Sequence, residues 1–199
     1  MGAGQPGGSP APPRRADARR NYERLLVAAT AAFAEHGADD VSLEEIARRA
    51  GVGIGTLYRH FPARQALLEA VYKDQVDGLD ALGAKLLTAE SPGAALGDWL
   101  RAFVAFGRTK HNLSAALVST IGRDAALISE CSMILRRRTE ELLHRAQDAG
   151  EARQSVQATD ILPLVHGLIM ATRAAPADPD QQDRLLSLVI GGLLSDDRA

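Results

Sequence analysis

Apolar residues recur every three or four positions along most of the chain, which is the spacing of amphipathic α-helices. The clearest run extends from Leu68 to Leu82. Alanine and leucine dominate, β-branched residues are sparse, and no segment longer than a few residues shows the alternation of a strand. We therefore predict an all-α fold of about nine helices.

Glycine and proline divide this pattern into separate helices. Three glycines are predicted to end helices: Gly37, Gly51 and Gly150. Pro62 lacks an amide proton and is predicted to separate the third helix from the fourth. A further turn is predicted at 111–114, before a short helix at 115–121, and the last two helices are expected at 160–173 and 181–194.

The composition excludes several classes of protein. Of 199 residues, 46% are hydrophobic, so a sizeable core can form. No apolar run approaches the roughly 18 residues of a membrane helix, and the N-terminus lacks the apolar core of a signal peptide, so we expect a cytoplasmic protein. The single cysteine, Cys131, excludes an intrachain disulfide. No metal-binding histidine spacing and no catalytic motif appears, so we expect neither a metal, a cofactor nor an enzyme.

The stretch GVGIGTLYRHF, residues 51–61, has the glycine-rich character of a phosphate-binding turn. A dinucleotide fingerprint would need glycine where Thr56 stands and a strand before Gly51, where a helix is predicted. Two short helices joined by a glycine-containing turn are instead typical of a helix-turn-helix. In such a unit the second helix enters the major groove of DNA by its N-terminal end. Ser42 and Glu45 have the spacing of a capping box for the first of the two helices.

A family resemblance agrees with this interpretation. The residues SLEEIARRAGVGIGTLYRHFPARQALLEAVY, from Ser42 to Tyr72, resemble the helix-turn-helix signature of TetR-family transcriptional regulators. The resemblance covers roughly residues 17–75, and the remainder resembles the family only in its helical layout. It implies a homodimer joined through the last two helices, an inverted-repeat operator in double-stranded DNA, and a helical effector-binding domain. Most members repress transcription and release DNA when a small molecule binds.

Three regions are predicted on this basis. Residues 1–16 form a disordered tail with a basic arm, 17–64 a helix-turn-helix DNA-binding domain, and 65–199 a helical ligand-binding and dimerisation domain. The basic arm, Arg14 to Arg20, either contacts DNA or is simply solvated. From Arg14 to Arg64, nine basic and seven acidic residues give a local charge of +2, against −4 for the remainder. This modest asymmetry permits DNA binding without requiring it.

Nine residues are candidate DNA contacts by their position in the motif: Ser42, Gly53, Ile54, Gly55, Thr56, Tyr58, Arg59, His60 and Arg64. Gly53 and Gly55 remove side chains where the backbone must approach DNA. Thr56 and Arg59 are the polar candidates for base contacts. Family members often carry a polar residue where this chain has Ile54, which could touch a thymine methyl or belong partly to the core.

The other four candidates are expected to contact phosphates or to support the fold. Tyr58 and His60 match phosphate-contacting positions, with a core tyrosine and a solvated histidine as the alternatives. Ser42 is expected to cap its helix, with a phosphate contact made by the nearby amides. Arg64 stands where the family often has a phosphate-binding lysine.

Seven residues are candidates for the effector pocket: Trp99, Phe103, Phe106, His111, Met133, His166 and Met170. For each of them, and for Cys131, a place in the core is the alternative. The charge run from Arg136 to Glu141 is interpreted as a solvated helix face.

Two classes of function remain open. The first is a sequence-specific regulator, most simply a repressor whose effector favours a conformation with recognition helices too far apart for DNA. An activator, or a regulator that answers a partner protein, is the alternative within this class. The second is a helical sensor or protein-binding module that has lost specific DNA readout. Only Ile54 and the modest charge asymmetry favour the second.

Overall fold

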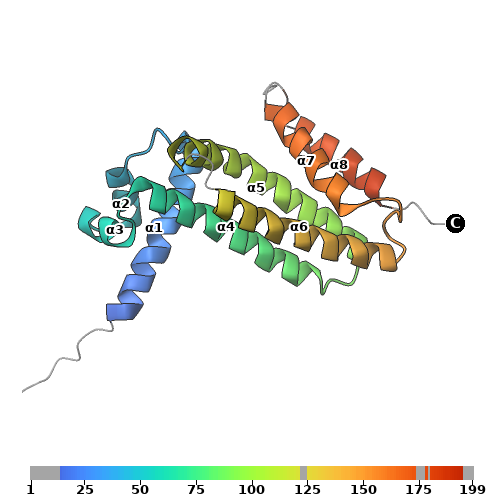
Figure 1. Cartoon of the computed structure of the whole chain (residues 1–199), viewed down its shortest axis with the longest axis horizontal. Coiled ribbons are helices and arrows are strands. Elements are labelled where there is room, and N and C mark those ends of the chain that lie inside the picture. Colours follow the sequence, from blue (N-terminus) through green and yellow to red (C-terminus); the bar gives the residue numbers. More distant parts are fainter. Residues whose placement is uncertain (1–13, 122–124, 174–177, 179, 195–199) are drawn as a thin grey trace, which may run out of the picture.

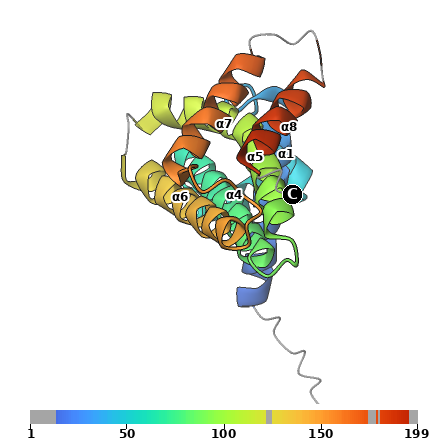
Figure 2. The same ribbon diagram turned by 90° about the vertical axis from the view of Figure 1, so that its right-hand side faces the viewer.

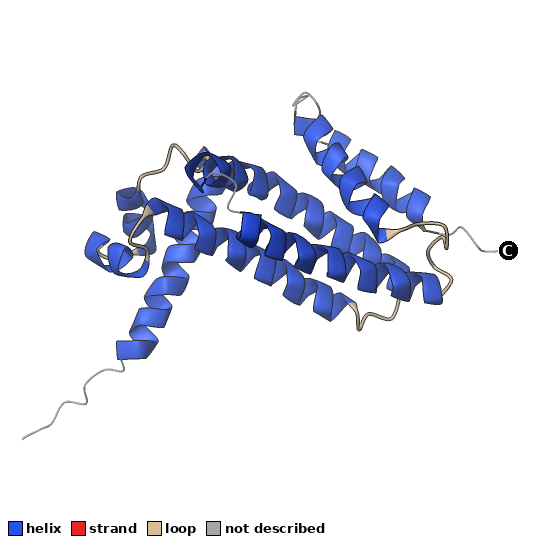
Figure 3. Cartoon of the chain, viewed as in Figure 1, coloured by secondary structure: helices blue, strands red, loops and turns tan. Residues whose placement is uncertain are grey.

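A computed structural model describes residues 14–121, 125–173, 178 and 180–194. These residues form eight α-helices and no strand, apart from one antiparallel bridge between Ala152 and Leu194, which confirms the predicted all-α fold (Figures 1 and 3). The helices are α1 (Arg14–His36), α2 (Leu43–Ala50), α3 (Ile54–His60), α4 (Arg64–Leu86), α5 (Pro92–Ile121), α6 (Ala125–Asp148), α7 (Ala158–Arg173) and α8 (Gln181–Leu193).

The predicted turn at 111–114 is wrong, because α5 continues through it to Ile121. No glycine or proline lies between Gly107 and Gly122. The histidine, asparagine and serine of this segment each lower helix propensity by less than about 1 kcal/mol, which helical neighbours readily offset. The merged helix explains why the described residues contain eight helices where about nine were predicted.

The three predicted helix-ending glycines all adopt positive φ, at 85° for Gly37, 63° for Gly51 and 72° for Gly150. These angles favour glycine because a Cβ would be strained there.

At the N-terminal end of the chain, α1 already begins at Arg14, so the predicted basic arm forms helical turns. Within it, Arg19 pairs with Glu23 at 2.8 Å and Arg20 pairs with Asp17. The predicted disordered tail lies, up to residue 13, outside the described residues.

Helices α1 to α3 form a compact unit at one end of the molecule, and α4 leads from it into the larger helical bundle (Figure 1). The core of the small unit is fully buried at Phe33, Ile46, Leu57 and Leu67. Because Leu67 belongs to α4, the first turn of α4 is part of the same core. Further along α4, the side chains pack against α5 and α6 instead. Helix α4 is therefore shared by both parts of the structure.

Helices α4, α5 and α6 pack side by side, α7 lies against α5 and α6, and α8 lies against α5 and α7 (Figures 1 and 2). Trp99 is fully buried in this bundle, and its indole N–H donates to the Thr139 hydroxyl at 3.0 Å. None of the helices in the described part of the chain has the length and apolar character that a membrane crossing requires.

A partly buried ion pair joins α4 to α6. Arg138 is only 8% exposed, and its guanidinium lies 2.7 Å from carboxylate oxygens of both Asp80 on α4 and Glu141 on α6. The interpretation of this charge run as a solvated face is therefore wrong for Arg138. The side chain fits there because α4 has glycine at position 83. A Cβ on Gly83 would lie 2.3 Å from Arg138 Cγ and 2.9 Å from Trp99 Cζ3.

This close approach predicts opposite effects for alanine at two glycines of α4. Gly83→Ala should lower the free energy of unfolding by about 1–3 kcal/mol, because the methyl group displaces buried neighbours. Gly78→Ala should raise it by about 0.5–1 kcal/mol, because nothing lies within 4 Å of a Cβ there and alanine favours the helix. Urea denaturation of both variants measures the difference, and equal effects would contradict the packing described.

Candidate nucleic-acid interface

Helix α2 is closed at both ends by its own sequence. The Ser42 hydroxyl accepts from the Glu45 amide at 3.1 Å, as the predicted cap requires. The Glu45 carboxylate does not complete the box but accepts from Arg48 and Arg49 on the same helix. At the C-terminal end, the Gly51 amide donates to the Arg48 carbonyl and the Val52 amide to the Ala47 carbonyl, which is a Schellman motif. This motif turns the chain sharply into α3.

One side of helix α3 is buried in the core, and the rest of the helix is exposed to solvent. Leu57 is fully buried and Phe61, just past its end, is 2% exposed. Elsewhere on the helix Tyr58 is 47% and Ile54 38% exposed. Gly53, which precedes the helix, is exposed as well, and a Cβ there would meet nothing within 4 Å. The N-terminal end of α3 is therefore a surface that another molecule can approach closely.

The polar candidates of α3 lie together on this open side. Arg59 is exposed, and its Nε donates to the Gly55 carbonyl at 3.1 Å. The same guanidinium lies 3.5 Å from the Thr56 hydroxyl. A Cβ on Gly55 would also meet nothing within 4 Å. The contact folds Arg59 along its own helix and places its charge beside Thr56.

His60 is held at the edge of an aromatic cluster. Its ring is half-buried and packs edge-on against Tyr22 of α1, with ring centroids 5.8 Å apart. Tyr22 also lies against Phe61, at 5.2 Å. The histidine thus fastens the C-terminal end of α3 to α1, and it remains only partly accessible.

Arg64 has a structural role that sequence reasoning missed. One of its Nη atoms donates to the Val41 carbonyl at 2.6 Å, and the other donates to the Ala38 carbonyl. The guanidinium also lies 5.9 Å from the centre of the Phe33 ring. Arg64 therefore ties the loop between α1 and α2 to the start of α4. The phosphate contact expected for it stays a prediction.

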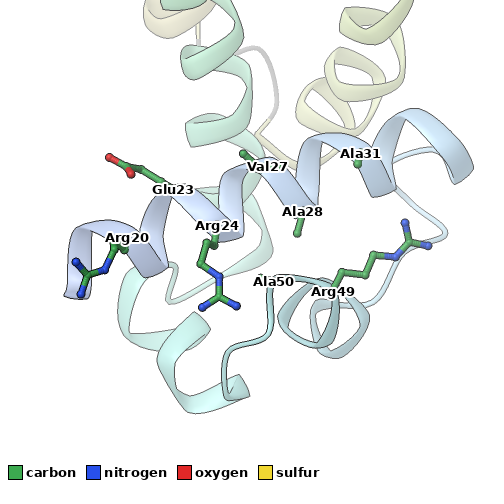
Figure 4. Close-up of a pocket in the computed structure, with 8 residues that line it drawn as sticks. All are labelled: Arg20, Glu23, Arg24, Val27, Ala28, Ala31, Arg49 and Ala50. Atoms are coloured by element: carbon green, nitrogen blue, oxygen red, sulfur yellow. The ribbon is translucent and has the colours of Figure 1, made fainter. Parts of the chain in front are cut away.

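Two further arginines, Arg24 and Arg49, border a groove of about 560 Å³ between α1 and α2 (Figure 4). In the figure Arg24 extends from α1 toward the turn between α2 and α3, where its Nη2 lies 3.4 Å from the Gly51 carbonyl oxygen. Arg49 points the other way along α2 and pairs with Glu35 at 2.6 Å and with Glu45 at 2.7 Å. Hydrogen bonds from Arg49 lower the pKa of both glutamates. The spacing of Glu45 and Arg49 is a recognisable signal in the sequence, whereas nothing local marks Arg24.

Comparison with known proteins identifies this arrangement. Residues 25–71 match the family described as bacterial regulatory proteins, tetR family, and residues 91–195 match the C-terminal domain of SbtR-like transcriptional regulators. The chain belongs to the TetR family. TetR-family proteins are transcriptional regulators, so membership in the family supports the prediction of a regulator and not that of an enzyme.

Solved TetR-family structures extend the likeness over nearly the whole chain. The TetR transcriptional regulator SCO0520 from Streptomyces coelicolor is 34% identical, with a TM-score of 0.76 over 87% of this chain and 98% of its own. A TetR regulatory protein from Mycobacterium vanbaalenii is 35% identical, with a TM-score of 0.75 over 92% of this chain and 100% of its own. An HTH-type transcriptional regulator of Staphylococcus aureus is 38% identical over 63 residues, and the match spans only about a third, 34%, of its length.

The residues predicted for a TetR-family effector pocket are not all brought together. Phe103 and His166 line one cavity of about 390 Å³. Trp99 and Phe106 lie in the core, as does Cys131. Two methionines are exposed and do not line that cavity: Met133 and Met170. The side chain of His111 lies outside the described part of the chain.

Two polar groups on α4 add to this region. Burial raises the pKa of the Tyr72 phenol, whose ring centre lies 6.1 Å from that of Phe106. One turn further along, the amide atoms of Gln75 are buried and find no hydrogen-bond partner within the described structure. A buried amide without a partner is costly, so Gln75 is a candidate contact for a bound molecule that the sequence did not single out.

The bonds of Arg64 generate a stability prediction. Arg64→Ala should lower the free energy of unfolding by about 1–3 kcal/mol, because it leaves the carbonyls of the buried residues Ala38 and Val41 without their donors. Arg59→Ala, which removes an exposed arginine a few residues away, should change it by less than about 0.5 kcal/mol. Urea denaturation tests both, and a harmless Arg64→Ala would mean that the loop is held by other contacts.

Proposed function

We propose that the chain is a homodimeric repressor that binds an inverted-repeat operator through α3 and releases it when a small-molecule effector binds. The observation that carries this proposal is the open N-terminal end of α3, which is rigidly supported by Leu57 and Phe61. A helix in this setting can enter the major groove end-on. The partial positive charge of its N-terminus favours nearby phosphate.

Each candidate residue of α3 and of its N-terminal cap has a role in this proposal. Gly53 and Gly55 let the backbone approach the DNA, since neither position carries a side chain. Thr56 and Arg59 read base edges, and Ile54 contacts a thymine methyl, for which its exposure is suited. Two further candidates, Tyr58 and His60, donate hydrogen bonds to phosphates and fix the register without reading sequence.

The exposed faces of α7 and α8 supply the proposed dimer contact. Leu188 is 72% exposed and Leu164 is 50% exposed, although both lie in otherwise well-packed helices. A Cβ on Gly191 or Gly192 of α8 would meet nothing within 4 Å, so another helix can approach closely there. A twofold dimer through this surface places two α3 helices on opposite half-sites, which matches the symmetry of an inverted repeat.

Helix α4 connects the proposed effector domain to the proposed DNA-binding surface. Its first turn packs in the small core, and Asp80 near its other end is bonded to Arg138 of α6. A ligand that changes how α4 sits against α5 and α6 therefore also moves α3. Release of DNA follows if the ligand binds the displaced arrangement more tightly than the DNA-competent one.

Selection of bound duplexes from random DNA by the purified protein should return an inverted repeat. On that operator, Arg59→Ala should cost about 1–3 kcal/mol of binding free energy and relax the preference at one base position of each half-site. Arg153→Ala, which removes an exposed arginine of the C-terminal domain, should leave affinity unchanged at the same salt concentration. Fluorescence anisotropy with the selected duplex measures both, and failure to enrich any sequence would refute specific recognition by α3.

Two glutamate substitutions, one at a leucine and one at an equally exposed valine, test the proposed dimer surface. Leu188→Glu on α8 should shift the protein from dimer to monomer in sedimentation velocity, because a charge in an apolar contact must be desolvated. Val27→Glu on α1 is the matched control, since Val27 is also 72% exposed, and it should leave the dimer intact. A Leu188→Glu protein that stays dimeric would place the interface elsewhere.

A further inference from the structure

The cavity lined by Phe103 and His166 has an apolar floor and a polar rim. Phe103 of α5 and Leu135 of α6 form the buried part, at 9% and 3% exposure, and half-buried Leu162 of α7 adds a third apolar wall. Exposed Arg136 of α6 and His166 of α7 stand at the outer edge. The cavity volume of about 390 Å³ lies within the usual range for small-molecule sites.

The charge of this cavity has a single sign. No aspartate or glutamate occurs among the described residues that line it. The three consecutive arginines of α6 differ in this respect. Arg137 and Arg138 both pair with Asp80, whereas Arg136 forms no ion pair with any described carboxylate, including Glu140 one turn further on. Arg136 therefore brings an uncompensated guanidinium to the rim of an apolar cavity.

The cavity is also separate from the surface proposed for the dimer. Leu162 and His166 are four residues apart and share one face of α7, while Leu164 lies on another. A partner protomer on Leu164 and Leu188 can leave the cavity mouth accessible. Its floor is part of the bundle that holds α4, because Phe103 and Phe106 form adjacent rings, 6.3 Å apart, and Phe106 in turn lies beside Tyr72 of α4.

From this geometry we infer that the effector is a small amphipathic carboxylate, whose apolar body lies on Phe103, Leu135 and Leu162 while its carboxylate is bound by Arg136 and His166. A guanidinium pairs with a carboxylate through two parallel, charge-assisted hydrogen bonds. A neutral or cationic head group cannot form this ion pair. The imidazole of His166 supplies a further N–H donor. The inference deepens the proposed function and rests on it only for the step from ligand binding to release of DNA.

A matched series of compounds tests the ligand class. Three apolar bodies, phenylbutyl, naphthylmethyl and decyl, are each prepared as carboxylate, primary amide and amine, and binding to the full chain is measured by isothermal titration calorimetry. At least one carboxylate should bind about tenfold more tightly than its amide, and the amine should bind most weakly. Arg136→Gln should remove this preference and leave the amide affinity unchanged. Arg137→Gln, with the same change of charge on the neighbouring residue, should retain it.

Each outcome bears on one of the two proposals. Four outcomes would overturn the inference. They are equal binding of carboxylate and amide, preference for the amine, absence of binding by all nine compounds, and an Arg136→Gln variant that still prefers carboxylates. Operator binding is measured in the same preparations without ligand, so loss of DNA recognition would refute the proposed function while leaving the ligand preference to stand. A carboxylate that binds at Arg136 but does not release the operator would refute the regulatory step alone.

Discussion

The sharing of α4 between two cores is the constraint on which the rest of the structure depends. Leu67 and Leu68 of its first turns are buried with α1 to α3, and Val76 and Leu79 are buried with α5 and α6. A helix buried at both ends cannot move in one core without disturbing the other, because packed interiors have few voids to absorb a shift. The two parts of the chain are therefore mechanically linked, although each has its own apolar centre.

Helix α3 is fixed less by its own seven residues than by the residues that surround it. Leu57 points into the core, the Arg64 guanidinium binds the loop before α2, and His60 packs edge-on against Tyr22 of α1. Such supports determine where an exposed side chain such as Arg59 stands. In the proposed complex a side chain reads a base only when its backbone is held to within a fraction of an ångström, so the proposal assigns these buried contacts to recognition as much as the exposed ones.

The sequence was sufficient to predict the structure wherever the deciding contact is local. Helix ends at Gly37 and Gly51 follow from backbone geometry at one residue, and the Ser42 cap from a bond three residues long. It was insufficient where the partner is distant. Arg64 and Arg138 bind atoms 23 and 58 residues away, so no periodicity could distinguish them from solvated charges. The false turn at 111–114 has the opposite cause, since weak local propensity there was overridden by the helix on either side.

The close approach of α4 and α5 at Gly83 has one more consequence. Trp99, the single tryptophan of the chain, lies against that glycine and hydrogen-bonds to Thr139 of α6. Its indole thus touches α4, α5 and α6, the three helices whose relative position is proposed to link ligand to DNA. Any sliding of α4 changes the packing and the polarity around this one ring. The protein thereby contains an intrinsic optical reporter of the packing of α4 against α5 and α6, with no competing tryptophan signal from elsewhere in the chain.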